Sequence, residues 1–159
     1  MSYNIGILIP STTKGIDCES YKDTFLYKLF LKSFIRTYDK KYGEKDIIYT
    51  IYVVVDDDDK IYSNEFETNK IISFVNLVKN VSIQFISSNG IEKGWVTKMW
   101  NKAFKRAYDD GCDYFYQCGD DIEFLDKEWT IDCIKAMEIH NNTGITGPID
   151  WGREQYKIA

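Results

Sequence analysis

The sequence predicts an α/β fold built on a mainly parallel sheet with helices on both faces. Short apolar runs rich in β-branched residues, which are typical of buried strands, alternate with longer segments whose apolar residues recur at helical spacing. The order reads as β-α-β-α-β-α-β-α-β, and no internal repeats or low-complexity tracts interrupt it. Because a crossover helix is the usual connection between parallel strands, we expect a three-layer α/β/α sandwich.

The first half of the chain supplies two strands and two helices. Residues 4–10 form an apolar run that ends at Pro10, which predicts a buried strand. Residues 20–38 carry apolar side chains at helical spacing, and residues 47–55 predict a second strand rich in β-branched residues. The helix that follows presents one apolar face, formed by Ile71, Ile72, Val75 and Val78.

The second half of the chain repeats this alternation. Residues 81–87 predict a third strand, and residues 96–108 predict an amphipathic helix. A fourth strand is expected over residues 113–118. The last two elements are a helix over residues 127–140 and a fifth strand over residues 145–149.

Composition narrows the possible functions. The chain has 159 residues, 44% of them hydrophobic, which is enough for one domain over residues 1–159 with its own core. A net charge of −5 argues against a general nucleic-acid binder, which needs a basic face. It does not argue against binding of a single diphosphate, because a divalent cation held by Asp residues can supply the positive charge.

Cysteine usage and hydropathy bear on the compartment. None of the four cysteines forms a Cys-x-x-Cys pair, so we expect free buried thiols in a reducing compartment. No apolar run reaches the roughly 18 residues that a membrane helix needs. A strand that begins by residue 4 leaves no room for a signal peptide, so the expected location is intracellular and cytoplasmic.

Three polar loops stand where predicted strands end. Pro10-Ser11-Thr12 ends the first strand, the run from Asp56 to Asp59 follows the second, and Gly119-Asp120-Asp121 follows the fourth. Ligands of open α/β sheets bind at the carboxyl ends of the strands. We therefore expect these three loops to converge on one site.

Asp120 and Asp121 are the candidate metal ligands. Adjacent carboxylates beside a buried strand repel each other and are costly to ionise, and a divalent cation removes that cost. Oxygen ligands favour Mg²⁺ or Mn²⁺, which keep positions open for phosphate oxygens. The alternative interpretation is a solvated turn in which one Asp caps the next helix.

Other polar residues extend the candidate site. An early Asp of the run 56–59 is chemically matched to the N–H donor of a uracil base, although such charge runs are usually solvated. Lys98 and Asn101 share one helix face, where Lys98 could meet a phosphate and Asn101 could orient the Asp loop, or both could be exposed. Three residues near the end of the chain could face the donor sugar or the acceptor, or could belong to a fraying terminus: Asp150, Trp151 and Arg153.

Taken together, the three loops resemble the GT-A glycosyltransferases, in particular the large inverting family of family-2 type, which has a Rossmann-like fold. In that family, strand one ends in Pro and a short polar loop, as at Pro10-Ser11-Thr12, and strand two ends in Asp residues that hold uracil, as at Asp56-Asp57-Asp58. A helix that carries Asn, here Asn101, leads to a strand that ends in an Asp-x-Asp motif. The resemblance covers roughly residues 4–150 in order.

This resemblance implies a metal-dependent glycosyltransferase domain. The implied donor is a nucleoside-diphosphate sugar, with a UDP-sugar expected, and the sugar would pass to a hydroxyl of a glycan, protein or lipid acceptor. Asp121, the last residue of the motif, would be the direct ligand of Mn²⁺ or Mg²⁺, and Asp120 would reach the ribose or a metal-bound water. The other residues that would bind the nucleotide sugar are Pro10, Ser11, Thr12, Asp56, Asp57, Asp58, Lys98 and Asn101.

The sequence departs from the family pattern in three places. Gly119 replaces the first Asp of the motif, and Trp100 replaces the usual Arg before the helix Asn, so we expect Lys98 to substitute for it. In the family, the acceptor region and the general base lie beyond the fifth strand, whereas this chain ends at Ala159. We therefore expect a donor-binding part that lacks the C-terminal acceptor region, with no identifiable base.

Two alternative functions remain open on the sequence alone. The first is a non-catalytic or truncated module that binds a nucleotide sugar without transferring it. The second is a sugar-phosphate nucleotidyltransferase, which has a similar sheet. The second is disfavoured because the loop after the first strand lacks the Gly-rich, Arg-containing pattern of that class.

Overall fold

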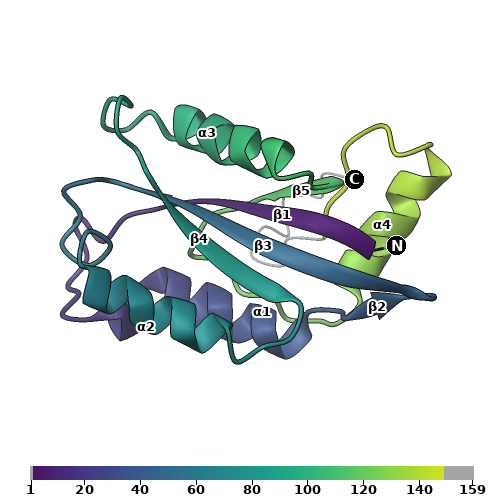
Figure 1. Cartoon of the computed structure of the whole chain (residues 1–159), viewed down its shortest axis with the longest axis horizontal. Helices are drawn as coiled ribbons and strands as arrows, with labels where there is room; N and C mark the ends of the chain where they lie inside the picture. The colour runs from purple at the N-terminus through teal and green to yellow at the C-terminus, as the bar shows by residue number, and fades with distance from the viewer. Residues whose placement is uncertain (1, 149–159) are drawn as a thin grey trace, which may run out of the picture.

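The computed structural model describes residues 2–148 and is built on a five-stranded, mixed, mostly parallel open sheet (Figure 1). Its strands are β1 (Ser2–Ser11), β2 (Lys41–Tyr42), β3 (Lys45–Val55), β4 (Val81–Ser87) and β5 (Tyr114–Gln117). β1 pairs with β3 and β5, and β3 pairs with β4, all in parallel, while β2 pairs antiparallel with the start of β3. The predicted α/β class and mainly parallel sheet are confirmed.

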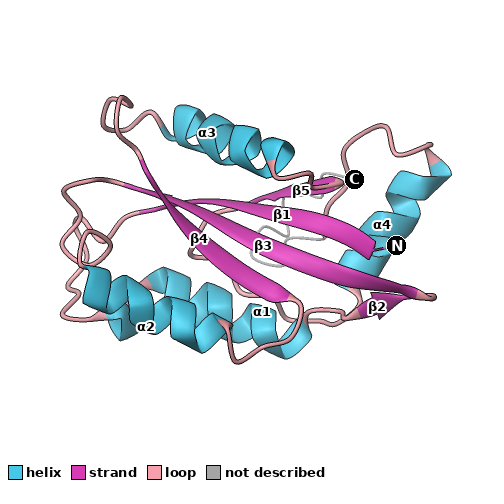
Figure 2. Cartoon of the chain, viewed as in Figure 1, coloured by secondary structure: helices cyan, strands magenta, loops and turns pink. Residues whose placement is uncertain are grey.

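Four α-helices cover the two faces of the sheet: α1 (Lys32–Thr37), α2 (Glu65–Val75), α3 (Val96–Asp109) and α4 (Trp129–Ile139). Figure 2 shows α3 on one face and α1 and α2 on the other. α4 belongs to the layer of α1, because the rings of Trp129 and Phe34 lie 6.3 Å apart. Within residues 2–148, no helix has the length and apolar character needed to cross a membrane.

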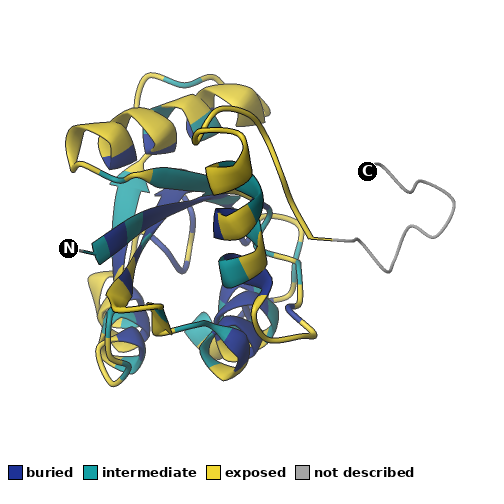
Figure 3. Cartoon of the chain, turned by 90° about the vertical axis from the view of Figure 1, so that its right-hand side faces the viewer, coloured by how far each residue is buried: buried dark blue, intermediate teal, exposed yellow. Residues whose placement is uncertain are grey.

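The core explains why the strands appear in the sequence as continuous apolar runs. Side chains alternate between the faces of a strand, and helices cover both faces of this sheet. In β3, Ile51 and Val53 pack into the core under α1 and α2, whereas Tyr52 and Val54 pack toward α3. Figure 3 shows the resulting buried interior and the exposed outer side of α3. All four cysteines are free thiols, as predicted. Cys18 and Cys118 are buried as expected, whereas Cys112 and Cys133 are only partly buried.

Two predicted elements were wrong in detail. Residues 145–148 form no strand, and Ile145 is fully exposed because no neighbouring strand covers it; residue 149 lies outside the described residues. The single helix expected over residues 20–38 is a 3₁₀ turn (Tyr21–Asp23), a π-helical segment (Leu26–Leu31) and then α1. The helix is interrupted at Thr24, whose backbone is extended and whose hydroxyl bonds to the carbonyl of Tyr21.

Gly6 allows α3 to pack closely against β1. A Cβ atom at residue 6 would lie 2.9 Å from Cβ of Ala107 and 3.2 Å from Sγ of Cys112. Because Cβ of Ala107 is fixed to the helix backbone, the contact cannot be relieved by a side-chain rotation. We expect Gly6→Ala to lower the free energy of unfolding by about 1–3 kcal/mol in urea denaturation. The control is Gly147→Ala at an exposed residue with open space around it, and a Gly6→Ala variant as stable as the wild type would contradict the prediction.

Candidate functional site

The strand register brings the predicted loops to one edge of the sheet. Ser11 is paired with Val55, Val55 with Ser87, and Leu8 with Gln117. The long strands β1, β3 and β4 therefore end side by side at the left of the sheet in Figure 1, and the short strand β5 ends opposite Leu8, before the end of β1. The Pro10–Thr12 loop, the Asp run and the Gly119–Asp121 loop are adjacent, as their order in the sequence predicted.

Asp59 ties the loop after β1 to the turn after β3. Its side chain is fully buried and accepts hydrogen bonds from the backbone N–H of Thr13 at 2.6 Å and from the Thr13 hydroxyl at 2.8 Å. On the other side it accepts the backbone N–H groups of Ile61 and Tyr62, both at 3.0 Å. Burial opposes ionisation, but the hydrogen bonds from Thr13, Tyr62 and Ile61 outweigh it and lower the pKa of Asp59.

Sequence reasoning treated Asp59 only as the last member of a solvated charge run. The signal that sets it apart is the apolar pair Ile61-Tyr62 that follows Asp59 after one intervening residue and is buried in the core. A carboxylate at the start of such a turn can accept the free N–H groups that follow it. Asp59 is therefore a structural residue that shapes the site.

Asp120 lies next to two buried hydroxyl groups. Oγ of Ser11 is 2.5 Å from Oδ2 of Asp120 and 2.8 Å from the hydroxyl oxygen of Tyr62. Burial raises the pKa of Asp120, the hydrogen bond from Ser11 opposes this rise, and the charge of Asp121 adds to it. Of the predicted residues, Ser11 is thus in direct contact with the Asp loop.

Gly119 leaves room for the carboxylate of Asp121. A Cβ atom at residue 119 would lie 2.6 Å from Oδ1 of Asp121. The Gly that departs from the Asp-x-Asp pattern thus accommodates the folded-back side chain of the candidate metal ligand. No group of three or more His, Cys, Asp or Glu side chains in the part of the chain that the structure describes is arranged to hold a metal. The loop itself offers two adjacent carboxylates, Asp120 and Asp121.

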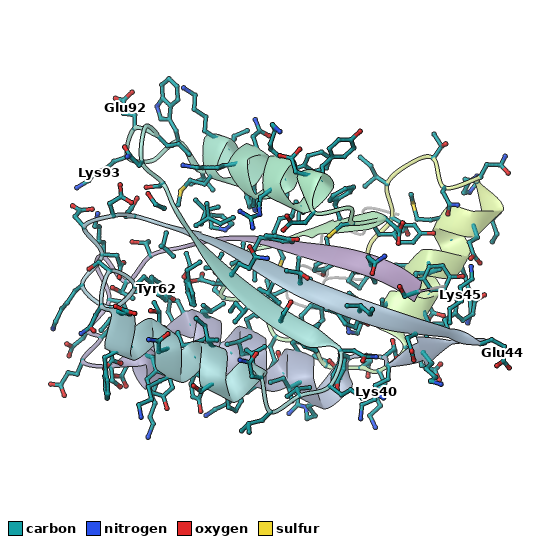
Figure 4. The ribbon with its side chains drawn as sticks, viewed as in Figure 1. Lys40, Glu44, Lys45, Tyr62, Glu92 and Lys93 are labelled. Atoms are coloured by element: carbon teal, nitrogen blue, oxygen red, sulfur yellow. The ribbon has the colours of Figure 1, made fainter. Side chains whose placement is uncertain are left out.

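Two lysines that sequence reasoning missed pair with the Asp run. Nζ of Lys14 is 3.2 Å from Oδ2 of Asp56 and also pairs with Asp58, while Nζ of Lys93 is 3.0 Å from Oδ2 of Asp58. Their hydrogen bonds lower the pKa of Asp58 to about 2. Figure 4 shows Lys93 at the same end of the sheet as Tyr62. The position of Lys14 in a polar loop after a strand was the signal in the sequence that could have found it.

The members of the Asp run differ in exposure. The side chain of Asp56 is 20% exposed and that of Asp58 is 62% exposed. Asp57 is exposed and accepts a hydrogen bond from the Ser87 hydroxyl. Of Asp56, Asp57 and Asp58, Asp56 is therefore the least exposed, and only Asp59 in the run is more deeply buried.

On α3, Trp100 contacts the Asp120-Asp121 loop, whereas Asn101 had been predicted to do so. Nζ of Lys98 lies 3.5 Å from the centre of the Trp95 ring, so the ammonium group makes a cation–π contact with that ring. Asn101 is exposed and makes no hydrogen bond to the Asp loop. Nε1 of Trp100 instead donates to the carbonyl oxygen of Cys118 at 3.3 Å, at the start of that loop. The other predicted residues, Asp150, Trp151 and Arg153, lie outside the described residues.

A hollow of about 380 Å³ lies elsewhere, between β5 and α4. Tyr114, Trp129 and Met137 are among the residues that line it, and none of the carboxylates of the Asp run or of the Asp120-Asp121 pair does. The candidate site is therefore an edge of converging polar loops, distinct from this hollow.

Comparisons of the chain with models of protein families, with curated proteins and with solved structures found no match. The resemblance to GT-A glycosyltransferases, which rests on the residues of the three loops and on their order along the chain, stays a prediction. Function is therefore inferred from the geometry and charges at this edge of the sheet.

Proposed function

We propose that the chain is a metal-dependent glycosyltransferase domain that binds a nucleoside-diphosphate sugar and transfers the sugar to an acceptor hydroxyl. The observation that carries this proposal is the convergence of Ser11, Asp56 and the adjacent Asp120 and Asp121 at the carboxyl edge of a parallel sheet. Ligands of open α/β sheets bind at this edge. A UDP-linked donor is the expected substrate.

Asp120 and Asp121 fit a divalent cation such as Mn²⁺ or Mg²⁺. They are adjacent residues with oxygen ligands, and both burial and the charge of Asp121 raise the pKa of Asp120. A bound cation would offset the cost of burying the charged carboxylate and the repulsion between the two carboxylates. Mg²⁺-type sites commonly use one or two carboxylates and complete their coordination with water and substrate phosphates. The bound ion would supply Lewis-acid stabilisation of the departing diphosphate.

The rest of the loop edge would position the nucleotide. Asp56, the least exposed of the three predicted base-binding carboxylates, is suited to accept the N–H of a uracil base, because hydrogen bonds to carboxylates are strong. Lys14 and Lys93 place positive charge at the same edge, where a diphosphate carries negative charge. The residues described here would bind and orient the donor, and such positioning is a large part of the rate gain in group transfer.

We expect Asp121→Ala to weaken Mn²⁺-dependent binding of UDP by at least about tenfold, which corresponds to about 1.4 kcal/mol. The measurement is isothermal titration of UDP into the full chain with and without Mn²⁺. Asp132→Ala, at an exposed residue of α4, is the matched control and should bind UDP like the wild type. Unchanged affinity in Asp121→Ala would reject the metal assignment.

The same protein separates the alternative functions. Mn²⁺-dependent hydrolysis of one member of a panel of UDP- and GDP-sugars would support the transferase. Clear nucleotide binding without turnover would favour a non-catalytic module, and release of pyrophosphate from UTP and a sugar phosphate would favour a nucleotidyltransferase. A wild-type chain that binds no nucleotide with Mn²⁺ would reject the proposal.

A further inference from the structure

Tyr62 and Ser11 form a buried hydrogen-bond chain that ends on Asp120. Ser11 is 4% exposed and Tyr62 is 5% exposed, so both side chains are largely shielded from water. The chain runs from the Tyr62 hydroxyl to Oγ of Ser11 over 2.8 Å, and from there to Oδ2 of Asp120 over 2.5 Å. It joins the turn after β3, the end of β1 and the loop after β5.

The direction of this chain follows from the number of protons. An ionised carboxylate can only accept, and Ser11 has a single hydroxyl proton. When Asp120 is ionised, Ser11 therefore donates to Asp120, and the oxygen of Ser11 accepts the proton of Tyr62. With the Tyr62 donor in place, the Ser11 proton has one preferred direction, which is toward Oδ2 of Asp120.

Both hydroxyl groups are held by rigid surroundings. The backbone N–H of Tyr62 bonds to the buried carboxylate of Asp59, and the Tyr62 ring packs against Phe85 with ring centres 5.7 Å apart. Ser11 is the last residue of β1 and is paired with Val55. Figure 4 shows Tyr62 at the loop edge of the sheet, on the side of α2.

We propose that Tyr62 is a positioning residue, which acts through Ser11 to fix the carboxylate of Asp120 for the bound nucleotide and metal. This inference rests on the proposed function. The hydrogen bond commits Oδ2 of Asp120 to the protein and thereby sets the direction in which Oδ1 points toward a ligand. A carboxylate held in advance loses less conformational entropy when the ligand binds.

The test is a pair of substitutions and their combination, measured by isothermal titration of UDP in the presence of Mn²⁺. Tyr62→Phe keeps the ring and removes only the hydroxyl group, and we expect UDP affinity to fall roughly threefold to tenfold. Ser11→Ala should lose at least as much, whereas Ser11→Thr keeps the hydroxyl group and should restore most of the affinity. The double variant Ser11→Ala/Tyr62→Phe should bind UDP no more weakly than Ser11→Ala alone, because Tyr62 acts only through Ser11.

Tyr52→Phe is the matched control. Tyr52 is also buried, and its hydroxyl donates to Asp110 at 3.0 Å on the opposite face of the sheet, so its removal should affect stability without changing UDP affinity. If Tyr62→Phe binds UDP as tightly as the wild type, or if the two losses simply add, the positioning role is rejected while the proposed function stands. If the wild type itself shows no Mn²⁺-dependent UDP binding, the proposed function fails and this inference fails with it.

Discussion

Replacing Asp59 by Asn is expected to lower the free energy of unfolding by about 3 kcal/mol, because it removes a buried carboxylate that accepts several hydrogen bonds. The carboxylate accepts from Thr13 on one side and from Ile61 and Tyr62 on the other. Asn offers only one carbonyl oxygen, so its amide group would face N–H donors on one of the two sides. At least one buried donor then loses its partner.

The stability difference between the wild type and Asp59→Asn should depend on pH. The pKa of Asp59 is lower in the folded state than its ordinary value of about 3.9 in the unfolded chain. The stabilisation is therefore fully present above the unfolded pKa and is lost as the pH falls through the folded pKa. The gap between the two proteins should be constant near neutral pH and should narrow below about pH 4.

Urea denaturation at a series of pH values measures both effects. Asp58→Asn is the matched control, since it makes the same chemical change one residue away at an exposed side chain whose partners are Lys14 and Lys93. Exposed ion pairs contribute little to stability, so the unfolding midpoint of this variant should stay close to that of the wild type. Equal midpoints for Asp59→Asn and Asp58→Asn would show that the Asp59 network is not a stabilising element.

The contrast between Asp58 and Asp59 shows where sequence reasoning reached its limit. The two residues have the same side chain and adjacent positions, yet one is exposed and the other is fully buried. Their difference arises from a turn that is fixed by tertiary contacts with Thr13, forty-six residues earlier. The residues of the Asp run alone do not indicate such a long-range contact. The charge pairs with Lys14 and Lys93 depend in the same way on loops that meet only in the folded chain.

Elements with a strong local period were predictable. The third predicted strand coincides with β4. The fourth predicted strand is one residue longer than β5 at each end, and the helix before it is one residue shorter than α3. Burial on a fixed face repeats along each of these elements, which made them predictable. The convergence of the loops also followed from the sequence, since parallel pairing places carboxyl ends together. The choice between Trp100 and Asn101 did not follow, because adjacent helix positions point in different directions and only the packed structure shows which one reaches Cys118.

Phe34→Ala is expected to cost about 3–5 kcal/mol of unfolding free energy, because it removes the central ring of the aromatic core under the sheet. Phe34 is fully buried. Its ring centre lies between 5.2 and 6.3 Å from those of its aromatic neighbours, which are Phe30, Tyr38, Tyr49, Phe124 and Trp129. These neighbours come from three separate parts of the chain, so the cavity could not close without moving several elements.

The matched control is Phe66→Ala on α2, at a residue that is 64% exposed. Its cost in unfolding free energy should stay within about 0.5 kcal/mol in the same urea denaturation.

Phe34 is also linked to the candidate site, because its ring contacts those of Phe124 and Trp129, which follow the Asp120-Asp121 pair in the chain. The backbone N–H of Phe124 also donates to Oγ of Ser33 at 3.0 Å. We therefore expect hydrogen exchange in residues 122–130 to accelerate more in Phe34→Ala than exchange in β4, which makes no ring contact with Phe34. Equal acceleration in both regions would mean that the aromatic cluster stabilises the fold as a whole without anchoring the segment behind the Asp loop. Faster exchange confined to residues 122–130 would instead identify Phe34 as the core residue that holds the loop edge in place from below the sheet.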